Sequence, residues 1–267
     1  MSEILRGGSA DEVIAAVEAN WRACVGAFGR APGVTIRDDD ELFWFLTGLP
    51  EATFNSIMYA NLAPGRIDTA VAELHTLRAV HNVPMNWVIG PTSRPLDLAE
   101  QLRARGFHHR RDLTPMTRSL VAPLPELDPV PGFTIERVVD AAALAEWIDA
   151  ELRGFESEGP TADGLAAIRH GMGLWPRIPM HYFLGRLDGE PVATATLLLA
   201  GGIAGIYDVS TVPEARRRGI GGAMTVAALH EARALGFETA FLQPSEMGEP
   251  LYRRLGFRVC CVCAIYG

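Results

Sequence analysis

Lysine is the residue type that this sequence lacks altogether, because all 24 of its basic residues are arginines. The absence excludes two common uses of a lysine side chain, the Schiff base with pyridoxal phosphate and the lysine of a P-loop. Neither half of the chain is basic, since residues 1–131 and 132–267 each hold 12 arginines against 16 acidic residues, for a net charge of −8. An evenly acidic chain gives no sign of a nucleic-acid partner.

Cysteines and long apolar runs are also scarce. Only four cysteines occur, three of them in the last eight residues, and their spacing fits neither a disulfide framework nor a zinc site. No stretch reaches the ~18 consecutive apolar residues of a membrane span, and the N-terminal segment has the amphipathic pattern of a helix rather than that of a signal peptide. We expect a cytoplasmic protein without a metal, a membrane or nucleic acid as partner; a homodimer is an open alternative.

A run of prolines divides the chain, whose 267 residues are about twice a typical domain length. Residues 121–131 read VAPLPELDPVP, and four prolines in eleven residues favour an extended linker between domains at 1–120 and 132–267. The segments LAEQLRARGF and GEPLYRRLGF end 150 residues apart, at Phe107 and Phe257. Each follows a predicted long helix and a strand, so we infer two copies of one fold.

Hydrophobic periodicity and turn residues predict the elements of each copy. The second copy has predicted strands at 134–138, 182–187, 191–200, 203–211, 238–243 and 257–265 and helices at 140–152, 161–172, 221–235 and 249–255. The first copy has predicted helices at 10–30, 68–81 and 96–105 and strands at 41–46, 54–61 and 86–89. The fold class is therefore α/β, with two tandem domains, each a mixed, mostly antiparallel sheet flanked by helices. In the last strand, alternation puts Cys261 and Cys263 on one face and Cys260 on the other, as small core residues.

The run from Asp208 to Gly222 carries the strongest functional signal. A strand ends before Pro213, a loop of arginines and glycines follows, and a helix begins inside that loop. Helix N-termini present unpaired amides and a partial positive charge, and glycines let a ligand approach the backbone closely. The loop therefore predicts a phosphate-binding site, although its pattern is neither a Rossmann nor a P-loop fingerprint.

The pattern Arg216-x-x-Gly219-x-Gly221, followed by Leu251-Tyr252-Arg253-Arg254-Leu255-Gly256-Phe257, resembles the GNAT superfamily of acyl-CoA-dependent N-acyltransferases. The resemblance covers residues 132–267 well and residues 1–120 only through the LRARGF echo and the order of elements. It implies that backbone amides of the loop hold the pyrophosphate of coenzyme A, while the preceding strand end pairs with the pantetheine arm. The implied cofactor-binding residues are Val209, Ser210, Thr211, Arg216, Arg217, Arg218, Gly219, Ile220, Gly221, Gly222 and Ser245.

The resemblance also implies a chemistry, in which an amine attacks the thioester of acetyl-CoA and coenzyme A leaves as a thiolate. By resemblance Tyr252 is the general acid, since its phenol, at pKa ~10, suits a thiol leaving group at ~8.5. Asp208 is the candidate base, with Glu246, Glu249 or a water path as alternatives, because some members place a glutamate near Gly205.

The sequence departs from the family pattern at the residue seven positions before this tyrosine. Members often have asparagine there, whereas this chain has Ser245. Glu156 and Glu158 lie in the loop between the first two predicted helices of the second copy. By resemblance this loop borders the acceptor site, so the two glutamates are either solvated acids or recognise a cationic amine.

The first copy lacks the residues to which the resemblance assigns function in the second copy. Leu102 stands where Tyr252 would fall, and no Arg-x-x-Gly-x-Gly precedes its long helix. We therefore expect one coenzyme A site, in the second copy, and a first copy that packs against the second or shapes its acceptor pocket. The function expected is acetyl transfer from acetyl-CoA to a primary amine of a small molecule or peptide, without a metal. The alternative is a non-catalytic acyl-CoA-binding sensor or interaction module.

Overall fold

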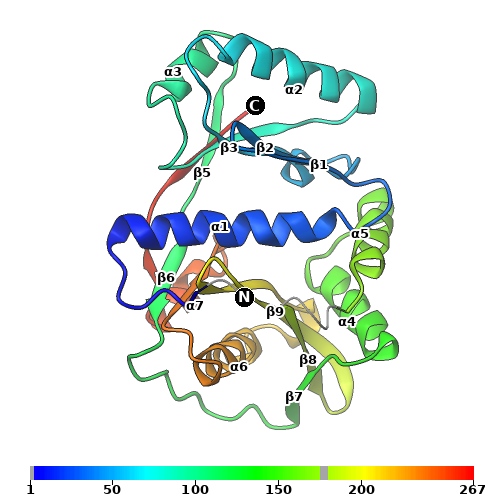
Figure 1. Cartoon of the computed structure of the whole chain (residues 1–267). Coiled ribbons are helices and arrows are strands. Elements are labelled where there is room, and N and C mark those ends of the chain that lie inside the picture. The colour runs from blue at the N-terminus through cyan, green and yellow to red at the C-terminus, as the bar shows by residue number, and fades with distance from the viewer. Residues whose placement is uncertain (1–2, 175–179) are drawn as a thin grey trace.

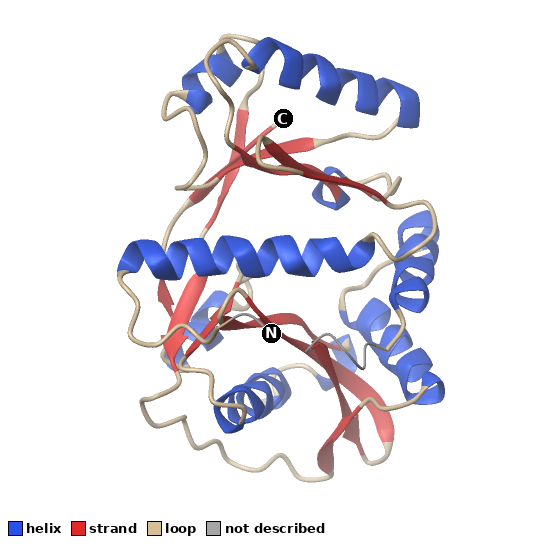
Figure 2. Cartoon of the chain, viewed as in Figure 1, coloured by secondary structure: helices blue, strands red, loops and turns tan. Residues whose placement is uncertain are grey.

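The computed structural model describes residues 3–174 and 180–267. In these ranges the strands form two sheets, of six and seven strands. Helix α1 (Ala10–Phe28) runs across the middle of the molecule, between the two sheets (Figure 1). Both sheets are mixed, mostly antiparallel and flanked by helices (Figure 2), so the predicted fold class is confirmed. No helix in the described part of the chain is long and apolar enough to cross a membrane.

The six-stranded sheet belongs mainly to the first half of the chain. Its strands, in spatial order, are β1 (Thr35–Asp38), β2 (Leu42–Leu46), β3 (Asn55–Ala60), β4 (Asn86–Ile89), β13 (Cys263–Tyr266) and β5 (His109–Leu113). Helices α2 (Ile67–His81) and α3 (Leu98–Arg103) cover the face turned away from α1 (Figure 1), and η1 (Ala52–Phe54) precedes β3. Leu74 and Leu98 from these helices pack on Trp87 of the sheet in one apolar cluster.

The seven-stranded sheet carries the site. Its strands, in spatial order, are β12 (Arg258–Val259), β6 (Met116–Ser119), β11 (Thr239–Leu242), β10 (Ile203–Thr211), β9 (Glu190–Ala200), β8 (Met180–Leu187) and β7 (Phe133–Arg137). Helices α4 (Ala141–Gly154) and α5 (Gly159–Met172) pack on one face, and α6 (Ile220–Ala234) and α7 (Glu249–Arg254) on the other. Alternation along β9 sends Leu197 to the α6 side and Leu198 to the α4 side, because successive strand residues face opposite ways.

The β8–β9 hairpin turns where the sequence indicates. Asp188 and Gly189 have φ of 52° and 92°, and Leu187 pairs with Glu190 across the two-residue loop. Two successive positive φ values define the turn whose twist matches that of the strands, and glycine and aspartate tolerate them best.

Each sheet contains a strand from the other half of the chain. Strand β6 lies between β11 and β12, and β13 lies between β4 and β5. The hydrogen-bonded sheets therefore do not follow the division of the chain at residues 121–131, a segment without helix or strand.

The expected single strand at 257–265 is wrong, because it is two short strands in two sheets. The chain passes between the sheets at residues 260–262, where the Cys260 amide donates to the Pro115 carbonyl at 2.9 Å. Strand alternation therefore does not apply to the cysteines: Cys263 is buried, whereas Cys260 and Cys261 are partly exposed. Strands β1, β5 and β6 were not expected from the sequence, since most of their residues are exposed or partly exposed and give no apolar alternation.

Helix α1 fastens the first half to the second. The buried Asn20 side-chain amide lies within 3.2 Å of three carbonyl oxygens of β9 and β10, those of Leu198, Ala200 and Ile203. Its oxygen accepts a hydrogen bond from the Tyr207 hydroxyl at 2.8 Å. Burial of an amide that keeps its hydrogen-bond partners costs little folding free energy, whereas burial without partners costs about 1–3 kcal/mol. A shift of α1 away from these partners would therefore be unfavourable.

Candidate active site

Strands β10 and β11 separate at the centre of the seven-stranded sheet. They pair in parallel only at Ala204–Ala240 and Gly205–Phe241. On its other side β10 has a bulge between Tyr207 and Ser210, and Asp208 in that bulge has φ of 50°. A bulge bends the strand, so the edge of β10 from residue 206 to 211 turns away from β11. Backbone groups on this edge are available to an extended ligand.

The Arg-Gly loop lies directly after this edge. Arg217 and Gly219 have φ of 61° and 84°, and Gly219 is the N-cap of α6. The first amides of α6 have no partner inside the helix. A Cβ placed at Gly221 would lie 3.8 Å from the Thr211 hydroxyl, so the strand end and the helix start are neighbours. The arrangement is a helix N-terminus beside a free strand edge, which suits a phosphate joined to an extended chain.

The Arg216 side chain points back into the protein. Its guanidinium donates to the carbonyl oxygens of Thr211 and Gly154, at 3.1 and 3.0 Å, and pairs with Glu156 at 3.0 Å. Arg216 thus ties the loop to the end of α4, and Glu156, one of the two acids considered for amine recognition, is its partner. Glu158 is the N-cap of α5 without a side-chain capping bond.

Helix α7 brings Tyr252 next to the same loop. Leu251 lies within 3.7 Å of the Cβ positions at Gly221 and Gly222, and the Tyr252 ring packs edge-on against Phe257. Tyr252 is only 8% exposed, and burial raises its pKa to about 12. Its phenol therefore keeps its proton at neutral pH, and the raised pKa widens the gap to the ~8.5 of a thiol leaving group.

The serine that replaces the usual asparagine has a local partner. The Ser245 hydroxyl accepts from the Gly248 amide at 3.1 Å in the turn that leads to α7. Glu249 pairs with Arg253 on that helix at 2.6 Å, whereas Glu246 is exposed in the turn. Neither glutamate is held toward the bulge by a described ion pair.

Asp208 belongs to a buried charge cluster that the sequence analysis missed. Arg169 of α5 donates to Asp208 at 2.7 Å and to Glu151 of α4 at 3.0 Å. Arg169 and Glu151 are 8% and 5% exposed, and the guanidinium also lies over the Trp147 ring. One signal was present in the sequence: Arg169 lies four residues after Leu165 and three before Met172, on the apolar face of its helix.

Two carboxylates share this single guanidinium. Burial, together with the nearby Asp208 charge, raises the pKa of Glu151 to about 7, although Arg169 opposes the shift. Burial would lower the pKa of Arg169, but the two carboxylates outweigh it and hold that pKa above its usual value. Glu151 is therefore the group in this cluster that binds a proton as the pH falls through about 7. It lies beside the bulge of β10.

The Asn20 side chain of α1 occupies the space beside Gly205 where a larger side chain would lie. A Cβ at Gly205 would lie 2.4 Å from the Asn20 side-chain oxygen. A glutamate at this strand position is sterically excluded while α1 stays where it is. In the described part of the chain, the carboxylates near the bulge that can accept a proton are Asp208 and Glu151, which share Arg169.

The corresponding region of the six-stranded sheet is closed. Strands β3 and β4 also pair in parallel at only two positions. Beyond them the Arg94 backbone fills the gap, with its amide bonded to the Ala60 carbonyl at 2.8 Å and its carbonyl to the Leu62 amide at 3.0 Å. Leu102, at the position that matches Tyr252, is fully buried in the core. Among the described residues, no group of three or more histidines, cysteines or acids is placed to hold a metal.

Comparison with known proteins agrees with this geometry. Residues 142–257 match the model of the acetyltransferase (GNAT) family. The C-terminal half of the chain is a GNAT domain. The match includes β10, the Arg-Gly loop and α7, and leaves the first half outside it.

Solved structures resemble the whole chain. A GCN5-related N-acetyltransferase from Kribbella flavida has a TM-score of 0.70 at 19% identity, over 96% of this chain and 95% of that one. One from Sphaerobacter thermophilus has a TM-score of 0.60 at 17% identity, over 84% and 75%. A tandem GNAT protein from the clavulanic acid biosynthesis pathway has a TM-score of 0.59 at 15% identity, over 88% and 83%. The tandem arrangement is thereby confirmed at the level of the fold. No curated protein sequence matches this chain.

Proposed function

We propose that this protein transfers an acetyl group from acetyl-CoA to a primary amine of a small molecule or peptide. The observation that carries the proposal is that the start of α6 lies beside the β10 edge at Thr211, and that α7, the helix of Tyr252, contacts the same start of α6 through Leu251. The family match supports the use of an acyl-CoA. In this proposal acetyl-CoA supplies the activated acyl group as a thioester.

The residues of the chain divide the work. Backbone amides from Arg217 to Gly222 would hold the pyrophosphate, and the β10 edge at 209–211 would pair with the pantetheine arm. The Arg216 side chain would act indirectly, by fixing the loop through Thr211 and Gly154. Tyr252 would hold a proton at its phenol oxygen for the departing thiolate, because its raised pKa keeps it protonated.

Deprotonation of the amine is assigned to Asp208, directly or through water. Its carboxylate is fixed by Arg169 at 2.7 Å, and its side chain is 19% exposed at the bulge. The same ion pair favours the alternative, an acyl-CoA-binding module without turnover, because a carboxylate held by a guanidinium has one oxygen already engaged.

Replacement of Tyr252 tests the proposal and separates the two functions. In Tyr252→Phe, we expect the turnover number to fall at least tenfold, equal to about 1.4 kcal/mol of barrier, while acetyl-CoA affinity stays within about twofold. The ring still packs on Phe257, so the fold is retained. The measurement is coenzyme A released, by chromatography, with a panel of primary amines. Unchanged turnover would remove Tyr252 from the mechanism, and no release with any amine by the wild type would favour the binding module.

A further inference from the structure

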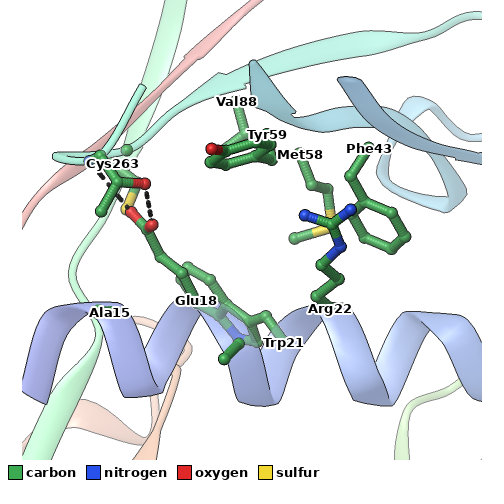
Figure 3. A pocket seen from close by; sticks show the side chains of 12 residues that line it. Ala15, Glu18, Trp21, Arg22, Phe43, Met58, Tyr59, Val88 and Cys263 are labelled. Atoms are coloured by element: carbon green, nitrogen blue, oxygen red, sulfur yellow. Dashed lines mark hydrogen bonds between the residues drawn. The ribbon is translucent and has the colours of Figure 1, made fainter. Parts of the chain in front are cut away.

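A cavity of about 300 Å³ lies between α1 and the six-stranded sheet (Figure 3). Its volume equals that of about ten water molecules. One side is the face of α1 opposite to Asn20, and the other is formed by strands β2, β3, β4 and β13. Because Asn20 faces the seven-stranded sheet, the helix separates this cavity from the bulge of β10. The cavity is therefore not part of the acetyl-transfer site.

The walls are mainly aromatic and apolar. Trp21, Phe43, Met58 and Tyr59 line the space, and Trp21 is held edge-on against Phe241 of β11 with ring centroids 6.1 Å apart. Figure 3 shows these side chains gathered around the opening between helix and sheet. Such walls suit a compact apolar body, since pockets for small molecules are largely apolar with a few polar groups that fix orientation.

The cationic side chain at one end of the cavity is already neutralised. The guanidinium of Arg22 lies 5.2 and 5.4 Å from the ring centroids of Phe43 and Tyr59. It also forms an ion pair with Asp38 and donates to the Asp39 carbonyl at 2.8 Å. Arg22 thus acts as part of the wall and not as a free positive charge.

The acidic side chain of Glu18 has no such partner. It accepts hydrogen bonds from the Thr92 hydroxyl and amide, and no ion pair joins it to a cation in the described part of the chain. Its carboxylate points toward the loop after β4 (Figure 3), where only a glycine leaves room: a Cβ at Gly90 would lie 2.5 Å from its oxygen. Burial raises the pKa of Glu18, although the Thr92 bonds and the more distant Arg94 oppose this. Glu18 is partly buried, and a carboxylate withdrawn from water without an ion-pair partner is stabilised by a cation.

We propose that this cavity binds a small organic cation, a primary ammonium group on a compact apolar or aromatic body. The ammonium would lie at the Glu18 carboxylate, and the apolar body between Trp21, Met58 and Tyr59. Aromatic faces add to the attraction, because their negative π-surfaces favour a cation. The proposal gives the first half of the chain a ligand of its own and does not depend on acetyl transfer.

The test is calorimetric titration of the full chain, without acetyl-CoA, with 2-phenylethylamine and with 2-phenylethanol as its neutral counterpart. We expect one amine per chain, bound at least tenfold more tightly than the alcohol. In Glu18→Gln, which can still accept the Thr92 hydrogen bonds, the two probes should bind within threefold of each other. The matched control is Asp11→Asn, an exposed acid on the same helix, and it should keep the preference for the amine.

A second variant tests the location independently of charge. Ala15 is exposed on α1 and lines the cavity, so Ala15→Leu should narrow the space and weaken both probes, without loss of helix propensity. Melting temperatures of all variants establish that they are folded. The proposal is overturned if the wild type binds neither probe, if it binds both equally, or if Glu18→Gln keeps the preference for the amine.

Discussion

The charge at the β10 bulge depends on one cationic and two acidic side chains, of which Arg169 and Glu151 are buried and Asp208 is partly exposed. Arg169 contacts both Asp208 and Glu151, and burial raises the pKa of Glu151 to about 7. Desolvation outweighs the salt bridge, which is the usual balance for a buried ion pair. Asp208 in the bulge is thus held by a guanidinium that it shares with Glu151, a carboxyl group that titrates near neutral pH.

This titration predicts a pH dependence of stability. The folded-state pKa of Glu151 lies above the reference value of 4.5, so the folded protein holds a proton that the unfolded chain releases. Its contribution to stability is therefore full below about pH 4.5 and is lost as the pH rises through about 7. Between pH 5 and pH 8, the free energy of unfolding should fall more for the wild type than for Glu151→Gln, as measured by urea unfolding. Asp149→Asn, exposed on the same helix, should behave as the wild type. Equal pH dependence in wild type and Glu151→Gln would contradict the assignment.

The short strands β6 and β13 connect the two sheets, because each pairs with strands from the other half of the chain. Strand β6 has four residues and lies next to the edge strand β12 of the second sheet, where Thr117 pairs with both Phe241 and Arg258. These partners lie more than 120 residues away along the chain. A substitution that disrupts β6, a strand of the first half of the chain, is therefore expected to weaken the second sheet.

A proline in β6 tests this connection. In Thr117→Pro the strand loses a backbone donor, so amides of β11 and β12 should exchange hydrogen at least tenfold faster than in the wild type. Thr117→Val, which keeps the donor, should leave their protection within threefold. Protection unchanged by the proline would mean that β6 does not hold the second sheet together.

Some elements and site residues could be predicted from the sequence, and others could not. The Asp188-Gly189 turn, strand β10 and the Arg-Gly loop follow from local patterns, and the structure places each where those patterns put it. The exchange of β6 and β13 does not, because a four-residue strand carries no information about which sheet it joins. The same limit explains why Asn20 and Glu151 were missed: their roles arise only when helices far apart in sequence meet the β10 bulge.

At the scale of the whole molecule, one sheet is open and the other is closed. Beyond Gly205, no strand in the described part of the chain pairs with the β11 side of β10, whereas the equivalent gap between β3 and β4 is filled by the Arg94 backbone. Helix α1 and the exchanged strands join the two sheets, so the asymmetry is built into a single interlocked molecule. We therefore expect one acyl-CoA site per chain, at the Arg-Gly loop of the second half.

Calorimetric titration with acetyl-CoA directly tests the prediction of one site per chain. The Cβ of a residue at position 221 would meet its neighbours at 3.7 and 3.8 Å, ordinary contact distances, so substitution there leaves the fold intact. We expect one acetyl-CoA per wild-type chain, affinity within threefold for Gly221→Ala, and a loss of at least tenfold for Gly221→Asp, whose carboxylate would repel the pyrophosphate at the helix N-terminus. Two molecules per chain, or binding unaffected by Gly221→Asp, would contradict the account.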